Sequence, residues 1–94
     1  MTASLKDIIR WFENGLKIKA AYMIVVCDSF DYEDYPHYVS QSEANDFWTH
    51  FDRYDNKNMQ WIVEVYDLNR PWAQQSQTQG RVWNVPDKPL PSII

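Results

Sequence analysis

The run Tyr22-Met23-Ile24-Val25-Val26-Cys27 decides the fold of this 94-residue chain. It is β-branched and almost continuously apolar, a pattern typical of a central strand that is covered on both faces. The run is far shorter than the roughly 20 residues that a membrane-spanning helix needs. Its cysteine is the only one in the chain and is expected to behave as a small buried hydrophobe. These features favour a protein of a reducing aqueous compartment, the cytoplasm.

Two amphipathic helices are predicted, one on each side of this run in the sequence. Ser4 is a suitable N-cap for the first helix, and Asn14-Gly15 should end it, because glycine readily adopts the left-handed conformation at a helix C-terminus. Residues 40–43, Ser-Gln-Ser-Glu, form a capping-box pattern before the second helix. The apolar positions at helical spacing are Leu5, Ile8, Ile9, Phe12 and Leu16, and then Ala44, Phe47, Trp48, Phe51 and Tyr54.

The remaining segments carry weaker strand and helix patterns. Residues 35–39 predict a short strand that pairs with 22–27 as a wide hairpin. Their proline cannot donate to a sheet ladder, which favours an edge strand or a position at the start of a strand. Residues 59–66 alternate as a half-buried strand, with Trp61, Val63 and Val65 on one face and Gln60, Ile62 and Glu64 on the other. Residues 81–85 predict a last strand. Pro71 is expected to open a short helix toward Gly80, with Trp72 as its anchor.

The resulting order, α-β-β-α-β-(α)-β, predicts a single α+β domain over residues 1–85. We expect a sheet of three or four strands, mixed or antiparallel, with the two amphipathic helices packed on one face. Residues 86–94 contain three prolines at near-alternate positions, which predicts an extended C-terminal tail.

The net charge of −4 is unevenly distributed. Residues 28–68 hold ten carboxylates against two basic side chains, whereas the segments on either side are each net positive. A negative surface repels phosphate backbones and attracts basic partners. Nucleic-acid binding is therefore disfavoured, and a protein partner with a basic surface is favoured.

The candidate functional segment is 28–38, which holds four carboxylates, one histidine and three tyrosines. It follows the buried strand, where folds often place functional loops. Exposed rings supply interface area while carboxylates select a basic partner. An ordinary interpretation remains open, in which aspartates of the loop accept hydrogen bonds from loop amides. The candidate partner-binding residues are Asp28, Asp31, Tyr32, Glu33, Asp34, Tyr35, His37 and Tyr38.

The sequence contains no recognisable catalytic, metal or cofactor motif. Segment 28–38 lacks the central glycine and alternate acids of a calcium loop, and two separated histidines with one buried thiol are too few for a zinc site. The two glycines, Gly15 and Gly80, cannot form a glycine-rich phosphate loop. His50 follows Asp46 by four residues on the predicted polar side of the second helix, which indicates a helical ion pair. We therefore predict no catalytic residue, no metal ligand and no cofactor.

One family resemblance follows from the pattern YMIVVCDxFDxEDYPxYV at residues 22–39, with Asn58-Met59-Gln60 and VEVYDL at 63–68. The chain resembles a family of short uncharacterised proteins found in bacteria and their viruses. The resemblance runs from the first helix to about Trp83. It implies no activity, cofactor or site residue, but it suggests that the acidic loop is a hallmark of such proteins.

These observations favour a small non-enzymatic interaction module that acts through its acidic and aromatic loop. One form of this hypothesis is a phage-encoded inhibitor or adaptor that binds a host protein. A first alternative is a small-ligand or divalent-metal site, with or without enzymatic activity, built from Asp28, Asp31, Glu33, Asp34 and His37 at the end of the first strand. A second alternative is an acidic mimic of nucleic acid. The chain is expected to be a monomer or a homodimer.

Overall fold

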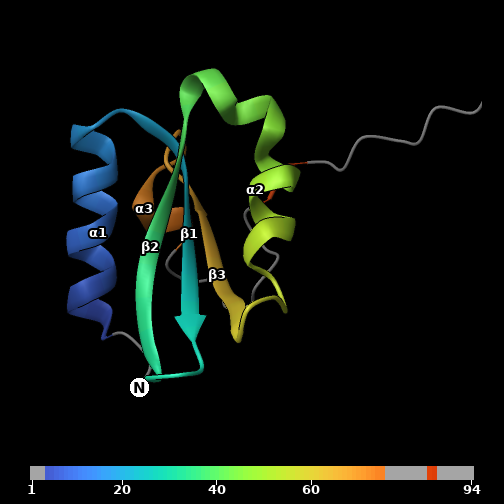
Figure 1. Cartoon of the computed structure of the whole chain (residues 1–94). Helices are drawn as coiled ribbons and strands as arrows, with labels where there is room; N and C mark the ends of the chain where they lie inside the picture. Colours follow the sequence, from blue (N-terminus) through green and yellow to red (C-terminus); the bar gives the residue numbers. More distant parts are fainter. Residues whose placement is uncertain (1–3, 76–84, 87–94) are drawn as a thin grey trace, which may run out of the picture.

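The computed structural model describes residues 4–75 and 85–86, and within them the fold is a three-stranded antiparallel sheet with helices (Figure 1). The α+β class is thus confirmed. The predicted last strand over 81–85 and the tail over 86–94 lie almost wholly outside the described residues, so the proposed domain boundary stays a prediction. In chain order the elements are α1 (Leu5–Lys17), β1 (Ala20–Asp28), β2 (Glu33–Ser40), the 3₁₀ helix η1 (Gln41–Asp46), α2 (Phe47–Tyr54), β3 (Gln60–Asp67) and α3 (Trp72–Gln75).

The apolar run lies in the central strand, as its composition predicts. The sheet order is β2-β1-β3, and both neighbours of β1 are antiparallel to it. Residues 23–26 of β1 are almost completely buried. The β1–β2 hairpin is also confirmed, with β2 at an edge of the sheet. Its connection is tighter than expected, because Glu33 and Asp34 already belong to β2 and only residues 29–32 form the turn.

The two amphipathic helices cover opposite faces of the sheet, so the prediction that both pack on one face is wrong (Figure 1). On one face, Met23 and Val25 of β1 pack with Phe12 of α1. On the other, Ile24 and Val26 of β1 pack with the aromatic side chains of α2. The reason is the composition of β1, because successive side chains of a strand point to opposite faces and those of β1 are apolar on both. Each face therefore needs a cover.

The predicted alternation in β3 is broken by a bulge. Val25 of β1 is opposite Glu64, but the next residue, Val26, is opposite Ile62, so Val63 is the extra residue. One extra residue reverses the direction of the side chains beyond it. Ile62 and Val65 consequently share the α2 face, although strict alternation places them on different faces.

The ends of α1 agree with the prediction at one terminus only. Ser4 caps the N-terminus by a reciprocal capping box with Asp7. The helix does not end at Gly15, however, but continues to Lys17, and Lys19 adopts the left-handed conformation with φ of 58°. Gly15 is instead a close-packing position, because a Cβ there would lie 2.8 Å from a methyl carbon of Leu68.

The predicted capping box of the second helix does not form. Residues 41–46 make a 3₁₀ helix before α2, and the Ser40 side chain does not cap it. The Ser40 hydroxyl lies 3.1 Å from the hydroxyl of Ser42, while the Glu43 carboxylate forms an ion pair with His50. Glu43 is therefore used for a tertiary contact.

The segment after β3 begins the short helix that Pro71 predicts. In α3, Trp72 stacks on Tyr66 at a ring-centroid distance of 5.5 Å and meets the edge of Phe12 at 5.2 Å, so it is the expected anchor. Residues 76–80 of the predicted helix lie outside the described part. No helix within the described residues is long and apolar enough to span a membrane.

Candidate functional site

The β1–β2 turn at residues 29–32 forms one end of the sheet, and its backbone is fixed by its own aspartates. Asp28 Oδ1 accepts a hydrogen bond from the amide of Phe30 at 2.9 Å, and Asp31 Oδ1 accepts one from the amide of Glu33 at 3.1 Å. Both contacts are the short-range turns that aspartate favours. The ordinary interpretation of these two acids is therefore confirmed, and their main effect is to shape the turn.

The turn is joined to the segment that precedes β3. The amide of Ser29 donates to the carbonyl of Met59 at 2.7 Å, and the Ser29 hydroxyl donates to the same oxygen at 2.5 Å. Tyr32 and Met59 both have left-handed backbones, with φ of 58° and 62°. Bulky residues rarely adopt this conformation, and it costs about 1–2 kcal/mol for each. Such strain tends to be kept at functional sites.

Large apolar side chains are exposed where these two segments meet. The exposed fraction is 80% for Phe30, 63% for Tyr32 and 62% for Met59. Asp31 and Glu33 are exposed beside them. We call the five residues Phe30, Asp31, Tyr32, Glu33 and Met59 the tip surface. Phe30 and Met59 are not among the binding residues predicted from the sequence, although Phe30 lies between Asp28 and Asp31, which are.

The chain has no match among the proteins with which it was compared. No protein-family model, curated protein or solved structure matches it. The resemblance indicated by residues 22–39 stays a prediction.

Two of the predicted binding residues face α1 instead of the tip. The Tyr38 hydroxyl donates to the carbonyl of Trp11 at 2.6 Å and accepts from the side chain of Asn14 at 3.3 Å. Asp34 lies opposite Cys27 in the hairpin. Burial and the neighbouring Asp34 carboxylate raise the pKa of the Cys27 thiol, which disfavours the reactive thiolate.

Two others, Tyr35 and His37, face α2. The Tyr35 hydroxyl accepts a hydrogen bond from Gln60 at 2.7 Å. His37 Nε2 lies 3.0 Å from His50 Nδ1, and its ring packs on Tyr54 at a centroid distance of 4.6 Å. Segment 28–38 is thus divided among three places, the tip and the two faces of the sheet.

His50 differs most from its prediction. It is buried, not on the polar side of the helix, and its partner is Glu43 instead of Asp46, with 3.0 Å between His50 Nε2 and the carboxylate. Helical spacing alone could not reveal the two partners of His50, because Glu43 lies in η1 and His37 lies in the preceding strand, β2. No group of three or more His, Cys, Asp or Glu side chains in residues 4–75 and 85–86 is arranged as metal ligands would be.

A cavity of about 490 Å³ lies on the α1 face. The cavity lies near the beginning of β1, because the amide of Leu68, one of its lining residues, donates to the carbonyl of Ala21. The small-ligand alternative predicts a site at the other end of β1, so this cavity is not the predicted site. The cavity is lined by Ile9, Phe12, Glu13, Leu16, Leu68, Asn69, Arg70, Pro71 and Trp72.

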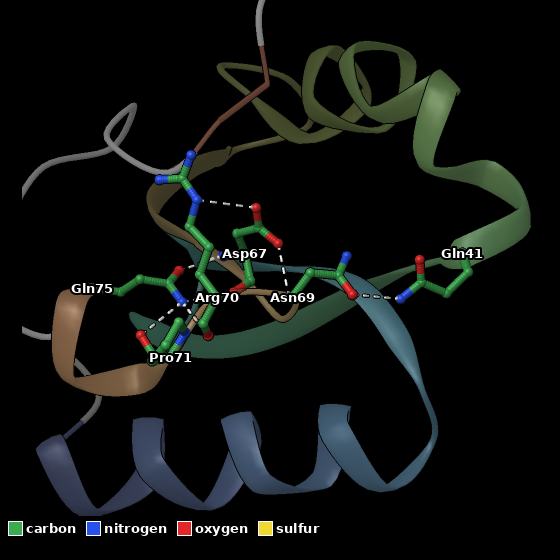
Figure 2. A network of polar contacts seen from close by, with 6 residues as sticks. All are labelled: Gln41, Asp67, Asn69, Arg70, Pro71 and Gln75. Carbon is green, nitrogen blue, oxygen red and sulfur yellow. Dashed lines mark hydrogen bonds and ion pairs between the residues drawn. The ribbon is translucent and has the colours of Figure 1, made fainter.

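One wall of this cavity is held in place by the polar network in Figure 2. The side chain of Gln75 is fully buried, and its Nε2 donates to the carbonyls of Asp67 and Arg70 at 2.6 and 3.0 Å. Its Oε1 accepts from the amide of Asp67 at 2.5 Å. The Asp67 carboxylate accepts from the amide of Asn69 and lies 3.6 Å from the Arg70 guanidinium. The conformation of the connection from β3 to α3 is therefore held by side-chain hydrogen bonds and an ion pair.

Proposed function

We propose that this protein is a non-enzymatic interaction module that binds a protein partner through the tip surface. The observation that carries the proposal is the exposure of Phe30 and Tyr32 on a turn whose backbone is fixed. Burying one such ring is favourable by about 1.5–3 kcal/mol. Phe, Tyr and Met are enriched at the centres of protein interfaces, which supports a protein partner.

The rigidity of the turn supports the same function. A flexible loop loses conformational entropy when it binds, and a preorganised one does not. Here the Asp28 and Asp31 contacts fix the turn internally, and Ser29 fixes it to Met59. The rings are therefore presented to a partner in a defined geometry at little further entropic cost.

The charge of the tip surface indicates the chemistry of the partner. Glu33 and Asp31 are exposed beside the rings. An apolar hollow with lysine or arginine at its rim is complementary to this arrangement. We propose that the partner is a host protein with such a surface, and that the module acts in the cytoplasm as a phage-encoded inhibitor or adaptor. The small size and the resemblance of residues 22–39 support this form of the proposal.

Site-specific photocrosslinking tests the proposal. A photoreactive phenylalanine analogue at position 30 should crosslink to one basic protein in host cells. The same analogue at Ile18 is the matched control, because Ile18 is also exposed and lies after α1, outside the tip surface. Equal crosslinking from both positions, or none from position 30, would refute the proposal.

Binding of the crosslinked protein is then measured with purified variants. Phe30→Ser should weaken it by about 2 kcal/mol, roughly thirtyfold, as for an interface hot spot. Asp31→Asn with Glu33→Gln removes the two charges but keeps an acceptor for the Glu33 amide. This double variant should weaken binding mainly at low salt. Ile18→Ser should leave the affinity unchanged.

A further inference from the structure

Two histidines meet across the interface between the edge strand β2 and α2. His37 Nε2 lies 3.0 Å from His50 Nδ1, and His50 Nε2 lies 3.0 Å from a carboxylate oxygen of Glu43. The three side chains come from β2, η1 and α2, which are consecutive in the chain. His50 is buried and His37 is partly buried, so the contact between the two rings is largely shielded from water, whereas the Glu43 carboxylate that His50 meets is exposed.

With both imidazoles neutral, one arrangement of protons satisfies both contacts. His50 carries its proton on Nε2 and donates it to the Glu43 carboxylate, which can only accept. His50 Nδ1 is then an acceptor. His37 must therefore carry its proton on Nε2 and donate it to His50.

One added proton is compatible with this arrangement, but two are not. A single proton on His50 Nδ1 lets His50 donate to both neighbours, while His37 moves its own proton to Nδ1. Two added protons place N–H groups on both facing nitrogens, His37 Nε2 and His50 Nδ1. The contact at 3.0 Å then becomes a repulsion between two donors of like charge.

The surroundings of His37 oppose its protonation. Its pKa is lowered by burial first, then by His50 and by Arg53 of α2, and the Glu43 carboxylate offsets this only in part. Tyr54 of α2 also packs on the ring. In the unfolded chain a histidine titrates near 6.5. Because the folded pKa is lower than this value, the stability from neutral His37 is complete above pH 6.5 and is lost as the pH falls below it.

We propose that His37, His50 and Glu43 form a proton-operated latch, which holds α2 on β2 near neutral pH and releases it when both imidazoles are protonated. Release uncovers the sheet face on which Phe47 and Phe51 of α2 pack. The device is independent of the tip surface. It makes the α2 face, and not the whole sheet, the part of the molecule that responds to acid.

Hydrogen exchange of the intact protein tests the latch. Protection factors of α2 amides are compared with those of β1 amides between pH 7.5 and 5.0. A release that takes up one proton lowers α2 protection by about tenfold for each pH unit below about 6.5. The β1 amides should change less. A parallel fall in both elements, or constant α2 protection, would overturn the proposal.

Two variants separate a latch from a merely structural contact. Glu43→Gln keeps an acceptor for His50 but removes the negative charge that stabilises the singly protonated pair. The closed form then binds its proton less readily, and release should move to higher pH. His50→Gln removes the imidazole that faces His37, so two like-charged donors can no longer meet. The pH response of α2 should weaken to the part that the burial of His37 alone causes. If Glu43→Gln leaves the midpoint unchanged, or His50→Gln retains the full response, the latch is wrong.

Discussion

The buried side chain of Gln75 should contribute more to stability than any other polar group in the connection between β3 and α3. Its amide satisfies the N–H and the carbonyl of Asp67 and the carbonyl of Arg70, and it lies 3.5 Å from the carbonyl of Pro71 (Figure 2). The glutamine side chain thus supplies the hydrogen bonds that a neighbouring strand or turn would otherwise give to these backbone groups. Trp72 belongs to the segment between Asp67 and Gln75 that these bonds hold together.

The change Gln75→Ala leaves these backbone groups without their partner. The carbonyls of Arg70 and Pro71 belong to exposed residues and can be hydrated, whereas the groups of Asp67 are partly buried. Each buried group left unsatisfied costs about 1–3 kcal/mol. With two such groups and the lost packing of the side chain, the free energy of unfolding should fall by about 3 kcal/mol. For a domain of this size that lowers Tm by roughly 15 °C.

Urea unfolding followed by tryptophan fluorescence measures this loss. Gln74→Ala is the matched control, because it removes the same side chain from the adjacent position of α3, where the side chain is exposed. It should change the free energy of unfolding by less than about 0.5 kcal/mol. If Gln75→Ala costs no more than Gln74→Ala, the network does not stabilise the fold and the reasoning is refuted.

The close packing of α1 and the burial of the thiol give two further predictions. Gly15→Ala should destabilise the protein by about 1 kcal/mol, because overpacking against Leu68 and Tyr38 exceeds the gain in helix propensity. Thermal unfolding checks this, and Leu68→Ala in the same chain should relieve the effect. At pH 8, Cys27 should react with iodoacetamide at least roughly tenfold more slowly than a free cysteine, since its pKa is raised. Mass spectrometry follows the reaction, and Asp34→Asn should accelerate it; an unchanged rate would contradict the assigned role of that carboxylate.

Local and strongly periodic features of the fold could be predicted from the sequence. The central position of β1 follows from a strand with apolar residues on both faces, and the edge position of β2 follows from Pro36. Ser4 caps α1 as its side chain favours. Each of these depends on residues within a few positions of one another, so no knowledge of the tertiary arrangement is needed.

Features that depend on distant contacts could not be predicted. The bulge at Val63 changes which residues of β3 share a face, and it is defined only by the pairing with β1. Gly15 follows Asn14 as glycine often does at a helix C-terminus. Its actual role is to leave room for the side chain of Leu68, which is far away in the sequence. The placement of α1 and α2 on opposite faces differs from these two features, because the composition of β1, apolar on both faces, is enough to indicate it, whereas the element order suggests one shared face.

The candidate site was predicted in part for the same reason. Asp28 and Asp31 act on amides two residues away, which is a local pattern. The contact between His37 and His50 spans thirteen residues and depends on how η1 turns the chain from β2 into α2. Neither helical nor strand spacing relates these two positions.

The number of acidic residues in the middle of the chain overstates the negative charge that is not already used in contacts within the protein. Asp28 and Asp31 accept hydrogen bonds from turn amides, Glu43 pairs with His50, and Asp67 pairs with Arg70. Each carboxylate used in this way organises its own backbone or a neighbouring side chain. In the β1–β2 turn, Asp28 and Asp31 fix the backbone on which the Phe30 ring is exposed to water. The acids of this segment and its exposed Phe30 ring are thus linked, because the hydrogen-bonded aspartates set the backbone geometry that exposes the ring.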